Sequence, residues 1–534
     1  MWKRNTDTIK NARSVVAKIY SKMIEKLEVS RNTALIILFL LYCKLVLCSS
    51  APNVLIILVD DMRHLSDKVV NLPNIKNMAA KGVHFKNAFA QQALCAPSRN
   101  SLLTGRRPDS LHLYDFYNYW RHTAGNFTTI PQFFKDNGYA TYSVGKVFHP
   151  GITSNFTDDY PYSWTYKPYH PPTEKYMNAP VCRDHTKQLH SNLICPVNVK
   201  KQPGGSLPDL ESLAMAVDIL KSNHSKPFLL AVGFHKPHIP LKFPRHYLAR
   251  VPITNVKPPT HPLMPPDMPL VSFHPWTDVR RRDDIARLNI SFPFGTMPYK
   301  WSLRIRQSYY AAAIYVDDLI GVLMSYVDLR KTIVVLSSDH GWSLGENGLW
   351  AKYSNFDVAL KVPLIFLAPD LPKKIIRTPV ELLDIFPTLV DLSGLPHKIP
   401  KCRGKLDKTL LCFEGKSLAP LMGDFTHMYG NYFAISQYPR PSLYPRRNSD
   451  KPRLKDIKIM GYSIRTKRYT EWVSFNNVLF TTDWSKIYGL ELYDHMVDPE
   501  ESNNIYLVNE YTYIKQYLSR LLRSRVDQDY NTLP

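Results

Sequence analysis

Short apolar runs alternate with amphipathic segments along most of the chain from residue 53 onward. The first run, 53–59 (NVLIILV), is apolar on both faces after its first residue, which is typical of a strand buried in a parallel sheet. Similar runs follow at 140–144, 227–234, 332–338 and 362–368. Segments with helical spacing of apolar residues lie between them, at 130–138, 211–222, 308–327 and 380–394. This alternation predicts an α/β fold with a large mixed, mostly parallel sheet covered by helices on both faces.

Three regions depart from this pattern. Residues 160–210 and 251–300 are rich in proline, and we interpret both as ordered excursions from the sheet. After about residue 430 the helical segments thin out, and short β-like runs appear at 431–438, 457–466 and 468–475. We therefore divide the chain into an N-terminal region (1–50), a main domain (51–435) and a smaller C-terminal α+β subdomain (436–534).

The N-terminal region contains one strongly apolar run. Residues 34–48 are interrupted by Lys44, and the run is shorter than the roughly 20 residues that cross a bilayer. Small residues follow at 49–51, as at a signal-peptide cleavage site. We interpret the run as a signal peptide, or a retained signal anchor, with Met1 or Met23 as the start. Four glycosylation sequons agree with entry into the secretory pathway, at Asn126, Asn155, Asn223 and Asn289. A cleaved signal would leave no stable membrane association.

Cysteines in such a compartment are expected to pair. Cys43 and Cys48 fall in the segment expected to be lost. Four others allow three pairings, of which the simplest closes two local loops, Cys182–Cys195 and Cys402–Cys412. In this scheme Cys95 has no cysteine left to pair with. It is either a buried free thiol or a reactive centre.

The chain is basic, with a formal net charge of +23. Such a charge favours anionic partners: nucleic acid, an anionic membrane face, or a sulfated or phosphorylated substrate. The sequence has neither zinc-finger spacing nor a continuous basic helix, so we expect no nucleic-acid partner.

Asp, His or Lys residues follow four of the predicted strands directly. They are Asp60 and Asp61, then Lys146 and His149, then His235 and His238, and finally Asp339 and His340. Because ligands bind at the carboxyl ends of strands in open α/β sheets, we expect these side chains to gather at one edge. Taken singly, each motif could be a helix cap, a turn or a structural histidine. Together, three hard carboxylates suit Ca²⁺ or Mg²⁺, and the cationic side chains suit a phosphate or sulfate ester.

The stretch Cys95-Ala-Pro-Ser-Arg99, followed by SLLTGRRPD, resembles the sulfatase signature C-x-P-S-R followed by T-G-R. The strand-end motifs match that family in order and spacing, and the resemblance covers about 53–500. It implies an alkaline-phosphatase/sulfatase-like fold, with catalysis in 51–435 and a contribution to substrate recognition from 436–534. Strings such as LYDFYNYWR, VGKVFHPG and WAKYSNFDVA are most similar to the exo-sulfatases that remove the 2-O-sulfate of terminal L-iduronate in heparan sulfate and dermatan sulfate.

The resemblance also implies roles for single residues. A formylglycine-generating enzyme would oxidise Cys95 to Cα-formylglycine, whose hydrate provides one hydroxyl to attack sulfur and a second to expel sulfate. One Ca²⁺ ion would be bound by Asp60, Asp61, Asp339, His340 and the modified Cys95. Arg99 would hold the formylglycine hydroxyl, while Lys146 and His149 position it, with His149 as the candidate base.

Sulfate and sugar recognition fall to a second set of residues in this resemblance. His238 and Lys352 would bind sulfate oxygens, and His235 would support them. Trp342, Tyr353 and Lys451 would contact the sugar, with Lys451 on the uronate carboxylate. The expected destination is the lysosome, with secretion as the alternative. Other readings are a different glycosaminoglycan sulfatase specificity, a phosphoesterase of the same superfamily, and a catalytically silent glycosaminoglycan-binding homologue.

Overall fold

The chain divides into two compact units, Met1–Ala51 and Pro52–Pro534. A computed structural model describes Lys18 and residues 51–65, 70–183, 186–395, 399–423 and 432–527. The apolar run 34–48, with Cys43 and Cys48, therefore lies outside the described residues. Among the helices that are described, none is both long enough and apolar enough to span a membrane.

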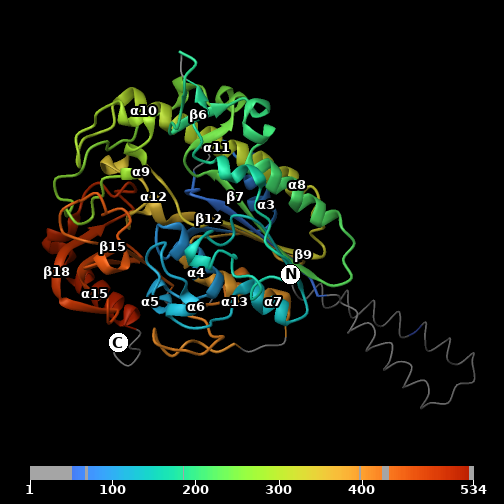
Figure 1. Ribbon diagram of the computed structural model, residues 1–534. Helices are drawn as coiled ribbons and strands as arrows, with labels where there is room; N and C mark the ends of the chain where they lie inside the picture. Colours follow the sequence, from blue (N-terminus) through green and yellow to red (C-terminus); the bar gives the residue numbers. More distant parts are fainter. Residues whose placement is uncertain are drawn as a thin grey trace, which may run out of the picture. The chain divides into compact units, whose positions relative to one another are not determined.

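An eight-stranded sheet forms the centre of the second unit (Figure 1). Its strands are β1 (Asn53–Asp60), β2 (Val83–Phe89), β3 (Ala140–Gly145), β7 (Phe228–Pro237), β9 (Thr332–Ser338), β12 (Lys361–Leu367), β13 (Lys374–Ile376) and β14 (Val380–Glu381). The spatial order is β13-β2-β12-β9-β1-β7-β3, and β14 also pairs with β2. Every pairing is parallel except those of β12 with β2 and β9. The predicted mixed, mostly parallel sheet is confirmed.

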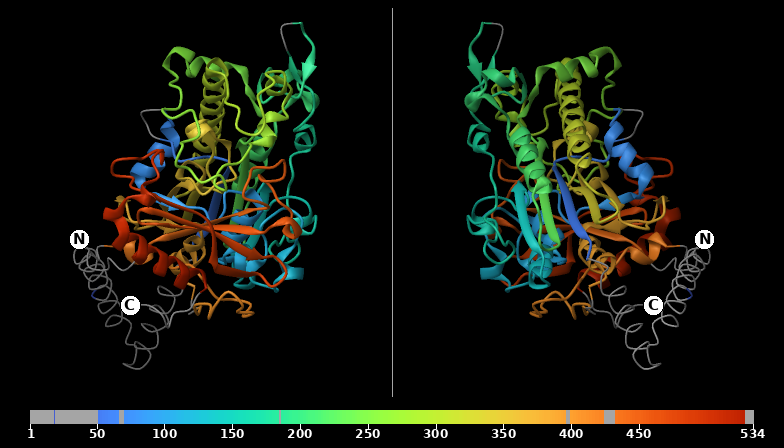
Figure 2. Two further views of the ribbon diagram at one scale, coloured as in Figure 1. Left: turned by 90° about the vertical axis from the view of Figure 1, so that its left-hand side faces the viewer. Right: turned by 90° about the vertical axis from the view of Figure 1, so that its right-hand side faces the viewer.

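Helices cover both faces of this sheet (Figures 1 and 2). One layer contains α3 (Pro73–Lys81), α8 (Pro208–Lys221) and α11 (Tyr299–Met324), and the other contains α4 (Cys95–Thr104), α7 (Ile130–Asp136) and α13 (Ile385–Ser393). Strands β7 and β9 are buried along their whole length, as expected for strands with helices on both sides. The small side chains Ala311, Ala312 and Ala313 of α11 are fully buried. They let this long helix pack closely against the sheet at β7.

The proline-rich regions form the expected excursions from the sheet. Short strands and helices occur in them and also elsewhere in the chain. The short strands are β4 (Cys182–Arg183), β5 (Leu189–His190), β6 (Ile194–Val197), β8 (Leu241–Pro244), β10 (Ser343–Leu344) and β11 (Trp350–Ala351). The short helices are α5 (Pro108–Leu111), α6 (Trp120–Thr123), α9 (Thr277–Arg280), α10 (Asp283–Ala286), α12 (Asp357–Leu360) and α14 (Ala419–Met422). Disulfides Cys182–Cys195 and Cys402–Cys412 confirm the simplest pairing. Among the described cysteines, Cys95 alone is free, and it is buried.

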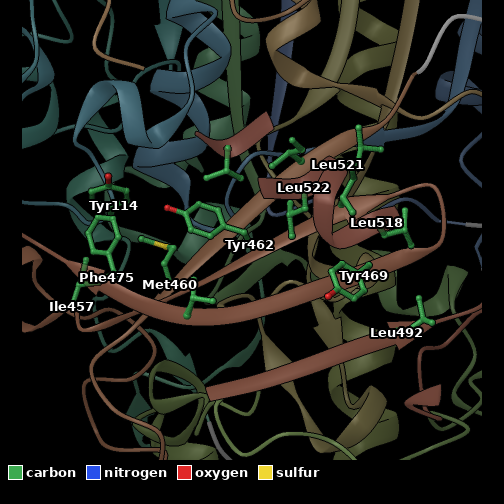
Figure 3. Packing of buried hydrophobic residues seen from close by; sticks show 14 residues of the cluster. Tyr114, Ile457, Met460, Tyr462, Tyr469, Phe475, Leu492, Leu518, Leu521 and Leu522 are labelled. Atoms are coloured by element: carbon green, nitrogen blue, oxygen red, sulfur yellow. The ribbon is translucent and has the colours of Figure 1, made fainter. Parts of the chain in front are cut away.

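A separate four-stranded antiparallel sheet follows near the C-terminus. It consists of β15 (Ala434–Arg440), β16 (Ile459–Arg465), β17 (Arg468–Asn476) and β18 (Thr481–Tyr493), and helix α15 (Thr512–Val526) packs against it. Leucines of α15 meet aromatic and aliphatic side chains of the sheet in one buried cluster (Figure 3), which includes Leu518, Leu522, Met460, Tyr462 and Leu492. A backbone hydrogen bond joins this small sheet to the segment just before Cys95: Gln437 N donates to Gln91 O at 2.7 Å.

Candidate active site

The carboxyl ends of β1, β3, β7 and β9 lie at one edge of the central sheet, as the sequence predicted. The turn after β3 requires a glycine. Gly145 has φ +69°, and a Cβ atom there would lie 2.3 Å from the carbonyl oxygen of Gly233 on the neighbouring strand. The chain can therefore turn tightly and direct Lys146 toward Asp60, whose Oδ2 accepts from the Lys146 Nζ at 2.6 Å.

Cys95 is the first residue of α4, a helix whose ten residues are all buried. Its sulfur lies 2.9 Å from Lys352 Nζ, 3.4 Å from His340 Nε2 and 3.8 Å from Asp61 Oδ1. Burial raises the pKa of the Cys95 thiol, although the charges of Lys146 and Lys352 oppose that rise. Since a protonated thiol is a weak nucleophile, the unmodified side chain is poorly suited to react.

Three buried carboxylates and one histidine surround this sulfur. One ligand atom from each of Asp61, Cys95, Asp339 and His340 lies within 4.8 Å of the others, and Asp60 belongs to an overlapping group with His238. Asp61 Oδ2 is buried and has no hydrogen-bond partner among the described residues. Burial, aided by the charges of Asp60 and Asp339 and opposed by Lys352, raises the pKa of Asp61 to about 7. A buried carboxylate oxygen without a hydrogen-bond partner is stabilised by a nearby cation, and hard carboxylate oxygens suit Ca²⁺ or Mg²⁺.

Arg99 fixes two of these carboxylates. It is fully buried, its Nη2 donates to Asp60 Oδ1 at 2.8 Å, and its Nε donates to Asp339 Oδ2 at 3.0 Å. Its Nη1 donates to the carbonyl oxygens of Lys146 and Val147, so the planar guanidinium ties together β1, β9 and the turn after β3.

Burial favours the uncharged form of two histidines of the site. Burial lowers the pKa of both His149 and His238 well below the usual value, and the charge of Lys146 lowers each further. The ring of His149 packs on Phe116 with 4.6 Å between centroids, while His238 Nε2 lies 3.8 Å from Asp61 Oδ2. A neutral imidazole can accept a proton, which is what a general base in this pocket requires.

The predicted sugar-contacting residues, Trp342, Tyr353 and Lys451, lie around Lys352 and Asp278. Lys352 Nζ donates to Asp61 Oδ1 at 2.7 Å, and the rings of Trp342 and Tyr353 are buried nearby. The Tyr353 hydroxyl donates to Asp278, and Lys451 Nζ donates to both oxygens of Asp278 at 2.9 and 2.8 Å. Asp278 was not predicted, because it stands in an ordinary helix start of α9 with no motif around it.

His235 pairs with two carboxylates other than those around Cys95. Its Nδ1 is 3.2 Å from Asp209 Oδ1 and its Nε2 is 3.4 Å from Glu174 Oε1. It lines a cavity of about 200 Å³ that Asp60, Lys146, His149 and His238 also line. Its supporting role remains a prediction.

A second His-carboxylate group lies apart from these residues. His495 Nε2 is 2.9 Å from Glu501 Oε1 and 3.4 Å from Asp357 Oδ2. Both carboxylates also pair with arginines, Arg465 with Asp357 and Arg468 with Glu501. We interpret this group as an ion-pair network that ties the segment after β18 to α12.

The four asparagines of the glycosylation sequons are exposed: Asn126, Asn155, Asn223 and Asn289. Each side chain is therefore accessible for glycan attachment, and glycosylation itself remains a prediction.

A profile of the family described as Sulfatase matches residues 52–395. The chain belongs to the sulfatase family and is a sulfuric ester hydrolase with an alkaline-phosphatase-like fold. It is 48% identical over 504 residues to human iduronate 2-sulfatase, which covers 86% of this chain and 92% of the relative. The mouse iduronate 2-sulfatase is 47% identical, covering 86% and 91%.

A solved phosphonate monoester hydrolase from Silicibacter pomeroyi superposes with a TM-score of 0.65 at 20% identity, covering 90% of this chain and 96% of that one. This likeness shows the fold alone.

Proposed function

We propose that this sulfatase removes the 2-O-sulfate from terminal L-iduronate units of heparan sulfate and dermatan sulfate. The observation that carries the chemistry is Cys95 at the start of a buried helix, 2.9 Å from Lys352 Nζ and surrounded by three carboxylates. The specificity is supported by the 48% identity to human iduronate 2-sulfatase across 86% of the chain. The net charge of +23 suits a polyanionic substrate.

One Ca²⁺ ion would be held by Asp60, Asp61, Asp339 and His340 together with residue 95. The unpartnered Asp61 Oδ2 and the three hard carboxylates fit such an ion. When bound, the ion supplies positive charge for a sulfate oxygen and lowers the pKa of a hydroxyl group. Arg99 holds Asp60 and Asp339 in place for it.

Residue 95 would act after a formylglycine-generating enzyme has converted it, which agrees with the poor reactivity of a buried protonated thiol. The converted residue supplies a hydrated aldehyde whose hydroxyl is the nucleophile toward sulfur. Lys352 and His238 would bind the sulfate oxygens. His149 would accept a proton, while Lys146 donates to Asp60 Oδ2 and its charge lowers the pKa of that carboxylate.

The sugar would lie against Trp342, Tyr353 and Lys451, with Lys451 facing the uronate carboxylate. Asp278 already pairs with Lys451, so the substrate carboxylate would share that ammonium group with it. Because Lys451 lies in the loop between β15 and β16, the C-terminal subdomain, 436–534, would contribute to substrate recognition.

We further propose a glycoprotein of the secretory pathway, delivered to the lysosome or secreted. The four exposed sequon asparagines support glycosylation.

Specificity tests the proposed function directly. With enzyme made in a eukaryotic secretory host, we expect kcat/KM for a disaccharide ending in 2-O-sulfated iduronate to exceed that for 6-O-sulfated glucosamine by at least about 100-fold. A reversed preference would indicate another glycosaminoglycan sulfatase specificity. Heparin binding without turnover of any ester would indicate the silent homologue.

Removing the divalent ion is expected to abolish turnover. Dialysis against a chelator should lower kcat by about 100-fold or more, because the ion contributes several kcal/mol of charge stabilisation. Added Ca²⁺ should restore kcat and raise the melting temperature, since it binds the folded state only. Full activity after chelation, with metal analysis showing no bound ion, would contradict the assignment of this site.

A further inference from the structure

A basic loop connects β15 to β16 beside the candidate active site. We call residues 441–458 the basic strap. Five of its cationic residues are exposed: Arg446, Arg447, Arg453, Lys455 and Lys458. Of its two acidic residues, Asp450 is buried. The strap therefore presents a strongly positive surface to solvent, which suits an anionic ligand.

The middle of the strap is fastened beside the predicted sugar-contacting residues. The buried Asp450 accepts hydrogen bonds from Thr277 N at 2.5 Å and from Thr277 Oγ1 at 2.7 Å. The next residue, Lys451, pairs with Asp278 at 2.8 Å. Asp278 also accepts from the hydroxyl of Tyr353, the residue after Lys352. Asp278 thus links Lys451 of the strap to Tyr353, whose neighbour Lys352 contacts Cys95 through its ammonium group.

A second contact, three residues further along the strap, joins it to the segment that packs on His149. Asp115 is buried, and its two carboxylate oxygens accept from Leu454 N and from Tyr117 N, each at 2.8 Å. Between these residues the Arg453 guanidinium lies over the Tyr117 ring, 4.8 Å from its centroid. Both Arg453 and Tyr117 are exposed, Tyr117 by 46%.

The Arg453–Tyr117 pair is connected to His149, the candidate base, through the residue before Tyr117. Phe116, the neighbour of Tyr117, packs on the ring of His149. Lys451, two residues before Arg453, belongs to the proposed uronate contact. An enzyme that acts on a terminal sugar encloses that sugar alone, so the next sugar of the chain must lie outside the pocket. The exposed pair is linked to Lys451 through the strap and to His149 through Phe116, so it lies at the surface next to both parts of the site.

We propose that Arg453 and Tyr117 form a binding subsite for the second sugar of the substrate, and that this sugar carries a sulfate group. This inference rests on the proposed function. The guanidinium can pair with two oxygens of a sulfate group, and its stacked position on Tyr117 limits the freedom lost on binding. The accessible part of the Tyr117 ring offers an apolar surface to the C–H groups of the sugar. The exposed residues Arg446 and Arg447 would extend this positive surface for sugars of the polysaccharide beyond the second one.

Two substrates with the same terminal residue test the subsite. The first is a disaccharide of 2-O-sulfated iduronate on a sulfated glucosamine, and the second is an aryl 2-O-sulfo-iduronide without a second sugar. We expect Arg453→Ala to lower the ratio of kcat/KM between the first and the second substrate about 5-fold to 10-fold, chiefly through KM. Arg453→Lys should recover part of the ratio, because it keeps the charge but loses the bidentate geometry. Tyr117→Leu should lower the ratio as well.

Lys226→Ala is the matched control. Lys226 is exposed and lies two residues before β7, at the end of that strand opposite to the site. Its removal changes the net charge equally but should leave both substrates unaffected. A ratio unchanged in Arg453→Ala and Tyr117→Leu would overturn the subsite while leaving the proposed function intact. Wild-type protein that hydrolyses neither substrate would overturn both.

Discussion

Replacing Cys95 by alanine is expected to lower kcat/KM for sulfate esters by about 10⁴-fold or more, because it removes the nucleophile itself. The lost thiol contacts Lys352 Nζ at 2.9 Å and His340 Nε2 at 3.4 Å, and neither contact holds an element of the fold together. We therefore expect the variant to fold, to bind heparin and to melt within a few degrees of the wild type. Steady-state kinetics and calorimetry on the same sample measure both quantities.

The control for this prediction is a cysteine change elsewhere. Replacing Cys402 and Cys412 by alanine opens a disulfide away from the pocket and is expected to cost about 2–4 kcal/mol of stability. Activity per folded molecule should persist, because neither residue contacts the carboxylate cluster. If Cys95→Ala retained activity within tenfold of the wild type, residue 95 would not be the nucleophile.

Replacing Arg99 by methionine is expected to destabilise the protein by about 3–5 kcal/mol and to abolish turnover. The guanidinium is completely buried and bridges Asp60 and Asp339, at 2.8 and 3.0 Å. Without it, two buried carboxylates lose their fixed positions, and the proposed metal site loses its geometry. Denaturant unfolding measures the loss of stability, and activity normalised to folded protein measures the loss of function.

Arg107→Met separates the two effects. Arg107 forms a bidentate ion pair with Glu381, at 2.7 and 2.8 Å, and is almost as buried, but it lies outside the pocket. We expect this variant to lose stability while keeping activity per folded molecule. If Arg99→Met kept the same activity per folded molecule as Arg107→Met, Arg99 would act only through stability.

The sheet and the carboxylate cluster could be predicted because strong local signals produce them. Runs such as 53–59 are apolar on both faces, and parallel strands bring their carboxyl ends together without further information. The direction of β12 was harder, because an apolar run is the same in a parallel and an antiparallel strand. Its pairing depends on tertiary contacts with β2 and β9.

Two C-terminal elements were missed for physical reasons. Strand β18 is half-exposed over most of its length, so its sequence lacks the apolar run that marks a buried strand. Helix α15 buries Leu518, Leu521, Leu522 and Val526 on one face, while its other positions are mostly polar or basic. Asp278 and Asp115 could not be predicted, since each acts on a partner more than 170 residues away. No local pattern records such a contact.

The central claim, that residue 95 becomes the catalytic formylglycine of a sulfatase, is tested most directly by the mass of the peptide that contains it. The protein should be made in a eukaryotic secretory host that carries the converting enzyme. We expect the peptide to be lighter than its sequence requires by the difference between a CH₂–SH group and an aldehyde. An unmodified Cys95 thiol in fully glycosylated protein that nevertheless hydrolyses sulfate esters would contradict the claim.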